Sequence, residues 1–97
     1  MANYILSERA RKGLLDIGNY TKEKWSEEQA ERYVLMILTE CKALADSPLA
    51  GRSYEPYRPG LLGKTCGKHV IFYRILPDNR VRIVRVLHER MDFLRYH

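Results

Sequence analysis

Residues 69–88, HVIFYRILPDNRVRIVRVLH, predict two β-strands joined by a tight turn, and large apolar side chains occupy both faces of this hairpin. If the turn centres on Asp78 and Asn79, His69 lies opposite His88, and opposite residues share a face. A half-exposed hairpin would alternate apolar and polar residues. One face here holds Val70, Phe72, Arg74, Leu76, Val81, Ile83, Arg85 and Leu87, and the other holds His69, Ile71, Tyr73, Ile75, Arg82, Val84, Val86 and His88.

The first half of the chain predicts a short strand followed by two helices. Residues 3–6 are apolar, and Ser7 fits a helix N-cap because its hydroxyl can accept a hydrogen bond from a first-turn N–H. Ser26 and Gln29 match the capping box that begins a second helix. Because the connection is so short, the two helices must lie antiparallel. Their apolar stripes comprise Ala10, Leu14, Ile17, Thr21 and Trp25, and then Ala30, Tyr33, Val34, Ile37, Leu38, Cys41, Leu44 and Ala45.

The predicted fold is therefore a single α+β domain over residues 1–97, with the order β-α-α-β-β-β. It has a small antiparallel sheet with a helical hairpin packed on one face. Residues 47–61 contain several Pro and Gly residues and read as an irregular loop. The alternative to a partner is that this loop and the C-terminal tail cover part of the other face, but the loop is short and polar in places. We interpret that second apolar face as a partner-binding surface, because large exposed apolar patches mark binding sites.

The net charge of +5 is carried by the C-terminal part, where residues 58–97 hold only Asp78, Glu89 and Asp92 as acids. A basic surface fits an acidic partner. The two cysteines lie in unrelated contexts and predict reduced thiols in a cytoplasmic protein. No apolar run reaches the length of a membrane span, and the N-terminus has no secretory leader, so no membrane partner is expected.

Arg74 and Arg85 are unusual because a charged guanidinium on an apolar strand face is unfavourable unless it is paired. Each either pairs with an acid inside the chain or receives one from a partner. Acids are scarce in this part of the chain, which favours the partner.

Several motifs in order resemble the ParE toxins of the RelE/ParE superfamily. The stretch YILSERARKGLLDIGNYTKEKWSEEQAERYV resembles the family's opening, and residues 57–62 correspond to its LRPGLL motif. GKHVIFYRI and VRIVRVLHERMD match its C-terminal signature. The resemblance covers residues 3–93.

This resemblance implies the RelE/ParE-like fold and a toxin of a type II toxin–antitoxin system. A ParD-type antitoxin would neutralise it by covering the unsealed sheet face. The implied target is DNA gyrase, whose inhibition blocks replication, with no catalysis, no cofactor and no direct DNA binding by the chain alone. Candidate antitoxin contacts are Tyr20, Tyr33, Phe72, Arg74, Ile83 and Arg85; candidate target contacts are Arg74, Arg85, His88, Arg90, Met91, Phe93 and Arg95.

The alternative is the RelE branch, which uses the same fold to cut mRNA on the ribosome. Cleavage through a 2′-hydroxyl needs proton-transfer groups and cations on the phosphate. Arg74 and Arg85 could hold the phosphate, but His88 falls on the opposite face in the predicted register. The VLHERMD stretch also follows ParE. The remaining members of this nuclease set would be Lys64, Lys68, Tyr96 and His97.

Other residues have simpler interpretations. Cys66, His69 and His88 could be drawn as a zinc site, but no fourth ligand suggests itself, so we expect no metal and a packed cross-strand imidazole pair. Cys41 is expected in the core. Trp25 is expected to pin the tip of the helical hairpin. Tyr20 and Tyr33 fit either an antitoxin groove or the helix–helix seam, and the sequence does not decide between them.

Overall fold

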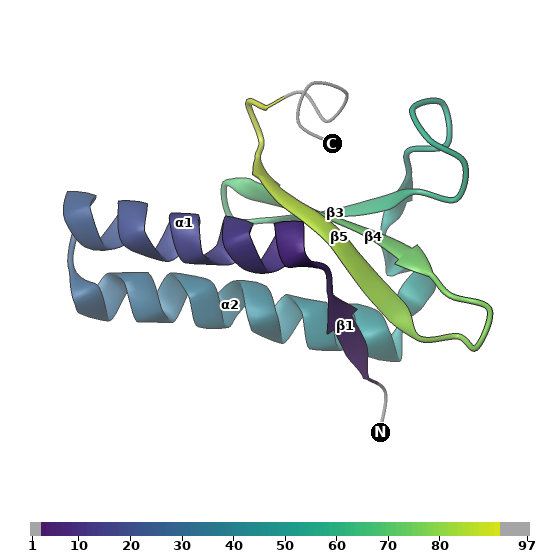
Figure 1. The fold of residues 1–97 in the computed structure, drawn as a ribbon, viewed down its shortest axis with the longest axis horizontal. Coiled ribbons are helices and arrows are strands. Elements are labelled where there is room, and N and C mark those ends of the chain that lie inside the picture. Colours follow the sequence, from purple (N-terminus) through teal and green to yellow (C-terminus); the bar gives the residue numbers. More distant parts are fainter. Residues whose placement is uncertain (1–2, 92–97) are drawn as a thin grey trace.

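The computed structural model describes residues 3–91 and confirms the α+β fold. A helical hairpin lies beside a twisted sheet, with both helices on the same side of it (Figure 1). The elements are β1 (Tyr4–Leu6), α1 (Glu8–Lys24), α2 (Glu27–Asp46), a 3-10 turn (Pro48–Ala50), β2 (Arg52–Ser53), β3 (Leu62–Cys66), β4 (His69–Ile75) and β5 (Val81–His88).

Both helices begin at the predicted caps. The hydroxyl of Ser7 accepts a hydrogen bond from the backbone N–H of Ala10 at 3.0 Å, and Ser26 does the same for Gln29. The Ser7 hydroxyl also donates to the carbonyl of Val84 at 2.8 Å, so the start of α1 is fixed to β5. The short connection makes α1 and α2 antiparallel neighbours, as expected (Figure 1).

The sheet is mixed, in the order β1-β5-β4-β3-β2. Strands β3, β4 and β5 pair antiparallel, as predicted, and the unpredicted strand β2 pairs antiparallel with β3. By contrast, β1 pairs parallel with β5 through Tyr4–Val81 and Leu6–Ile83. The helical hairpin explains this difference, because it carries the chain from the edge strand β1 across to the far strands before β5 returns to lie beside β1. The two-residue strand β2 lies inside the segment that was predicted to be an irregular loop.

The predicted register of the β4–β5 hairpin is right in one half and wrong in the other. His69–His88 and Phe72–Arg85 pair as expected, but Tyr73 pairs with Ile83. The connection is one residue longer than assumed, with Asn79 at φ 68°, and an irregularity between Phe72 and Tyr73 restores the predicted register. Because side chains alternate, this shift moves Ile83 to the helix-facing side of the sheet.

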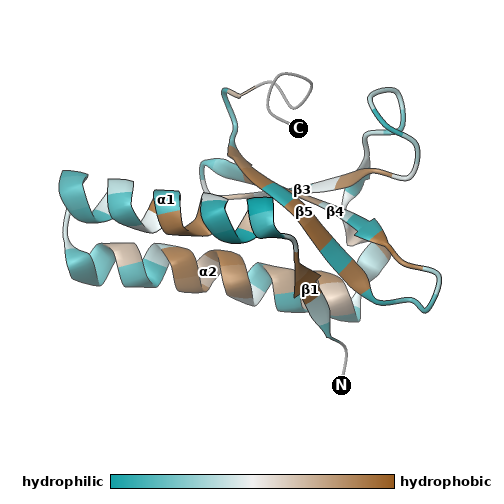
Figure 2. Ribbon diagram, in the orientation of Figure 1, coloured by the Kyte–Doolittle hydropathy of each residue, from teal (hydrophilic) through white to brown (hydrophobic). Residues whose placement is uncertain are grey.

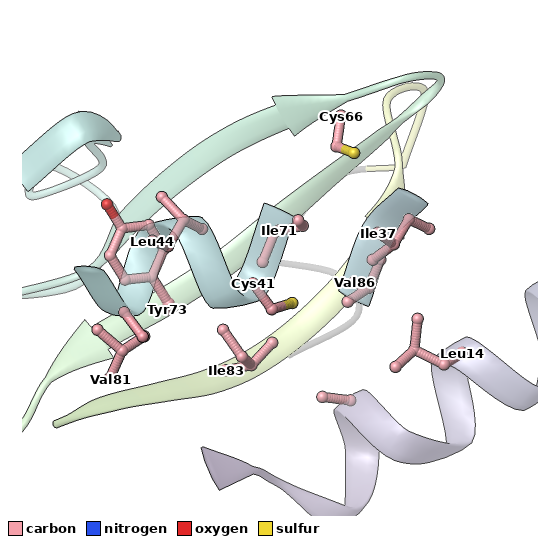
Figure 3. Packing of buried hydrophobic residues seen from close by; sticks show 12 residues of the cluster. Leu14, Ile37, Cys41, Leu44, Cys66, Ile71, Tyr73, Val81, Ile83 and Val86 are labelled. Carbon is pink, nitrogen blue, oxygen red and sulfur yellow. The ribbon is translucent and has the colours of Figure 1, made fainter. Parts of the chain in front are cut away.

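The main core lies between the sheet and the helical hairpin (Figure 3). Hydrophobic segments of both helices and of β5 are visible in Figure 2. Cys41 is fully buried here, as expected, and burial raises the pKa of its thiol to about 12. Tyr73 is also fully buried, and its hydroxyl donates to the carbonyl of Pro48 at 2.6 Å. The buried members are Ala10, Leu14, Ile37, Cys41, Leu44, Ala45, Cys66, Ile71, Tyr73, Val81, Ile83 and Val86.

The second sheet face is not open, which corrects the expectation that the chain lacks cover for it. Leu61, Phe72 and Leu87 are 1%, 4% and 5% exposed, and Tyr54 packs against them. The ring of Tyr54 meets Phe72 edge to face at 5.0 Å between centroids. Residues 54–61 thus form a loop that covers this small cluster, and the sequence prediction failed because it counted that loop as too polar.

That covering loop is held closed by its own hydrogen bonds. The N–H of Tyr54 donates to the carbonyl of Leu61 at 2.8 Å, and the N–H of Gly60 donates to the Glu55 carboxylate at 2.8 Å. Gly60 has φ +75°, a conformation that other residues rarely adopt. The loop is therefore a built element of the fold.

Candidate functional site

An apolar groove of about 520 Å³ lies where the tip of the helical hairpin approaches the end of the sheet. Its walls come from the last turns of α1, the first turns of α2, the β3–β4 turn and the end of β5. The lining residues are Asp16, Ile17, Tyr20, Thr21, Trp25, Gln29, Tyr33, Lys68, His69, His88 and Met91. We call this surface the tip groove.

Large side chains on the rim of the tip groove are exposed. Tyr20 is 61% exposed, Trp25 72% and Met91 44%. The expectation that Trp25 pins the helical hairpin is wrong for its side chain. Its backbone N–H caps α1 by donating to the carbonyl of Thr21 at 2.9 Å, which leaves the indole free to project outward. Exposed aromatic groups around a concavity are typical of binding sites.

The floor of the tip groove contains a polar network between α2 and the sheet. The hydroxyl of Tyr33 lies 2.7 Å from Nδ1 of His69 and accepts from the backbone N–H of Lys68 at 2.9 Å. Burial raises the pKa of Tyr33. Tyr33 thus contacts the sheet and lines the groove, and Tyr20 lines the groove beside it. That either residue contacts an antitoxin stays a prediction.

The predicted cross-strand imidazole pair is confirmed. The rings of His69 and His88 are 5.3 Å apart and meet edge to face. Burial, and then the neighbouring His88, lower the pKa of His69. Cys66 is buried in the main core, and residues 3–91 contain no group of three His, Cys, Asp or Glu side chains placed to hold a metal ion.

Arg74 and Arg85 share the second sheet face, as predicted, but neither forms an ion pair within residues 3–91. The guanidinium of Arg74 donates to the carbonyl of Pro59, so this cation holds the covering loop. Nε of Arg85 is buried and has no hydrogen-bond partner. Burial, and then nearby Arg9, lower the pKa of Arg85. Arg85 is thus a cation on this face with a buried nitrogen that lacks an acceptor.

The structure divides the remaining predicted contact residues among several places. Ile83 is fully buried in the main core and Phe72 lies under the covering loop, so neither is exposed for an antitoxin. His88 and Met91 line the tip groove, and Arg90 follows β5 as an exposed residue. Phe93 and Arg95, like Tyr96 and His97, lie outside the described residues. Sequence reasoning missed the role of Trp25, Ile17 and Lys68 in this groove, although their helical spacing and loop position were visible.

Comparison with known proteins identifies the family. Residues 4–93 match the sequence model described as the ParE toxin of the type II toxin–antitoxin system parDE. The chain belongs to the ParE toxin family. Toxin ParE1 of Caulobacter vibrioides is 38% identical over 92 residues, covering 95% of this chain and 94% of that protein. Toxin ParE1 of Mycobacterium tuberculosis is 35% identical over 91 residues, covering 94% and 93%.

Solved structures support the same fold. A chain of the chromosomal ParDE system from P. aeruginosa matches with a TM-score of 0.79 at 22% identity, covering 91% of this chain and 96% of that one. A chain of the RelBE2 toxin–antitoxin complex from Mycobacterium tuberculosis matches with a TM-score of 0.60 at 19% identity, covering 90% and 96%. Neither helix of this ParE-family chain, within its described part, is long and apolar enough to cross a membrane.

Proposed function

We propose that this ParE-family toxin inhibits DNA gyrase in the cytoplasm and blocks replication, and that a ParD-type antitoxin neutralises it by filling the tip groove. The observation that carries the antitoxin half is the exposed, mainly apolar groove rimmed by Tyr20, Trp25 and Met91. A free toxin that presents such a surface gains stability when an apolar segment covers it.

The chemistry of the tip groove favours an amphipathic antitoxin helix with at least one acidic residue. Concave apolar grooves accept the apolar face of a helix through anchors spaced three and four residues apart. Lys68 lies on the sheet side of the groove, and Arg90 is exposed just beyond it. An acidic residue on the antitoxin would meet this basic side, which fits the excess of positive charge in the C-terminal part of the chain.

Gyrase inhibition by binding is favoured over RNA cleavage by the placement of the candidate groups. The nuclease alternative needs Arg74 and Arg85 to hold a phosphate within reach of a proton-transfer group such as His88. Those arginines are on the second sheet face, whereas His88 lines the tip groove beside the helices. Arg74 is also engaged by the covering loop. The candidate groups therefore do not converge on one reacting bond.

Arg85 and Arg90 are predicted target contacts that form no ion pair within residues 3–91. Arg85 carries a buried donor without an acceptor, and Arg90 is exposed at the end of β5. Met91 follows directly, and the predicted contacts Phe93 and Arg95 continue from it. We propose that this C-terminal region, together with Arg85, engages gyrase.

Two parallel assays test the proposed target. Purified toxin is added to a gyrase supercoiling reaction and, separately, to an in vitro translation reaction with mRNA. The proposal predicts inhibited supercoiling with trapped cleavage complexes and intact mRNA. Arg85→Ala should reduce the inhibition while circular dichroism stays unchanged. Cleaved mRNA with unaffected gyrase would overturn the proposed target in favour of the nuclease.

The antitoxin half is tested independently of the target by direct binding. A ParD-type protein encoded beside the toxin gene is titrated against the toxin and against a Trp25→Ala variant. A stable complex that the variant weakens supports the proposal, and a complex that is insensitive to Trp25 would contradict the assigned groove.

A further inference from the structure

A second apolar groove, of about 630 Å³, runs along the seam between α1 and α2 and is separate from the tip groove. Leu15 from α1 and Leu35 from α2 lie along it, and each is 63% exposed. Hydrophobic colour is visible midway along both helices in Figure 2. The remaining lining residues are Leu6, Arg11, Leu14, Gly18, Asn19, Lys22, Glu27, Ala30, Glu31, Val34 and Leu38. We call this surface the seam groove.

The charges around the seam groove are sorted by helix. Its charged residues from α1 are basic, Arg11 and Lys22, and those from α2 are acidic, Glu27 and Glu31. Within residues 3–91, Lys22, Glu27 and Glu31 form no ion pair. A surface with one sign of charge along each side of an apolar strip is complementary to itself when it is turned over.

We infer that the seam groove is a self-association surface, on which a second copy of this chain docks with its α2 facing α1. In a two-fold dimer, the same patch meets itself. If the two-fold axis runs along the helices, α1 of one copy faces α2 of its partner, tip beside tip. Leu15 then meets Leu35 of the partner.

The charges favour a two-fold axis along the helices over a two-fold axis across them. Because α1 ends at Lys24 and α2 begins at Glu27, Lys22 lies at nearly the same level along the helical hairpin as Glu27 and Glu31. With the axis along the helices, Lys22 therefore faces the partner's acidic side. With the axis across the helices, α1 faces its own copy and Lys22 approaches Arg11 of the partner, which is repulsive.

The dimer is expected to be modest in affinity, since the apolar contact is small and exposed ion pairs contribute little. Formation of this dimer depends neither on the proposed gyrase target nor on the tip groove. A toxin dimer of this kind would leave both tip grooves available to two antitoxin segments.

Sedimentation of the purified full-length toxin over its accessible concentration range tests the inference. The weight-average mass should rise from that of a single 11.4 kDa chain toward twice that value. Leu35→Asp should abolish the rise, because a charge is placed in the apolar strip. Leu49→Asp is the matched control: Leu49 is 82% exposed but lies outside the groove, so this variant should associate like the native chain.

Charge exchange tests the orientation. Lys22→Glu and Glu31→Lys should each weaken association by about tenfold, since each turns an attraction into a repulsion. The double variant that carries both changes should recover most of the loss. Circular dichroism shows that each variant is folded. A toxin that remains monomeric throughout, a dimer unaffected by Leu35→Asp, or a double variant no better than the single ones would overturn the inference.

Discussion

The second face of the sheet and the tip groove are both rich in aromatic side chains, yet the chain treats them differently. On the sheet face, residues 54–61 cover Phe72 and Leu87, and the loop closes through hydrogen bonds of its own. In the tip groove, Tyr20 and Trp25 remain 61% and 72% exposed. Apolar composition alone therefore does not mark an interface. The apolar groups that the fold leaves uncovered are the ones available to a partner.

The largest expected effect comes from opening the covered face. Phe72→Ala should lower the free energy of unfolding by about 3–5 kcal/mol, because it removes a buried ring and leaves a cavity under the loop. Urea denaturation followed by circular dichroism measures the change. A loss below about 1 kcal/mol would show that the loop does not seal this cluster.

The tip groove should behave in the opposite way. Trp25→Ala should leave the free energy of unfolding within about 0.5 kcal/mol of the native value, since the indole is exposed. It should weaken binding of a ParD-type antitoxin by about 2 kcal/mol, or roughly 30-fold. Calorimetric titration measures the binding. Tyr57→Ala, which removes a 52% exposed ring outside the groove, serves as the matched control.

A smaller effect is expected where a cation fastens the covering loop. Arg74→Ala removes the hydrogen bond to the Pro59 carbonyl and should destabilise the fold by about 1 kcal/mol. Faster amide exchange in residues 54–61, with unchanged exchange in the helices, would locate that loss in the loop. If exchange instead changes equally throughout the chain, Arg74 does not act through this contact.

The smallest effect concerns pH. Because burial lowers the pKa of His69 in the folded state, the unfolded chain binds this proton more readily. Stability should therefore be highest above the unfolded pKa of about 6.5 and fall as pH drops toward the lower folded value. Denaturation midpoints compared at pH 7.5 and pH 5.5 measure this, and His69→Asn should reduce the difference. An unchanged difference in that variant would assign the pH dependence to other groups.

Much of the fold could be predicted because its signals are local. The caps at Ser7 and Ser26 and the apolar stripes of the two helices depend on near neighbours in the sequence, and the structure confirms them. The β4–β5 register at the end away from the turn was also predicted, including the His69–His88 pair. The register next to the turn was not predicted, because an alternating pattern reveals neither the longer turn nor the irregularity that compensates for it.

The candidate site was harder to predict because it depends on tertiary placement. Trp25 continues an apolar helical stripe, yet it lies just after the end of α1 and its side chain is exposed. Leu61 and Tyr54 come from a segment rich in Pro and Gly, whose polar composition concealed a hydrogen-bonded cover. Whether an apolar residue is covered is decided by distant parts of the chain, which local periodicity does not report.

Amide hydrogen exchange of the toxin, alone and bound to a ParD-type antitoxin, shows directly which surface the antitoxin covers. We expect protection on binding to concentrate in the segments that contain the lining of the tip groove, residues 16–33, 68–69 and 88–91, while residues 54–61 exchange as in the free toxin. Protection or displacement of residues 54–61, with no change around Trp25, would contradict binding in the tip groove. It would instead place the antitoxin on the second face of the sheet.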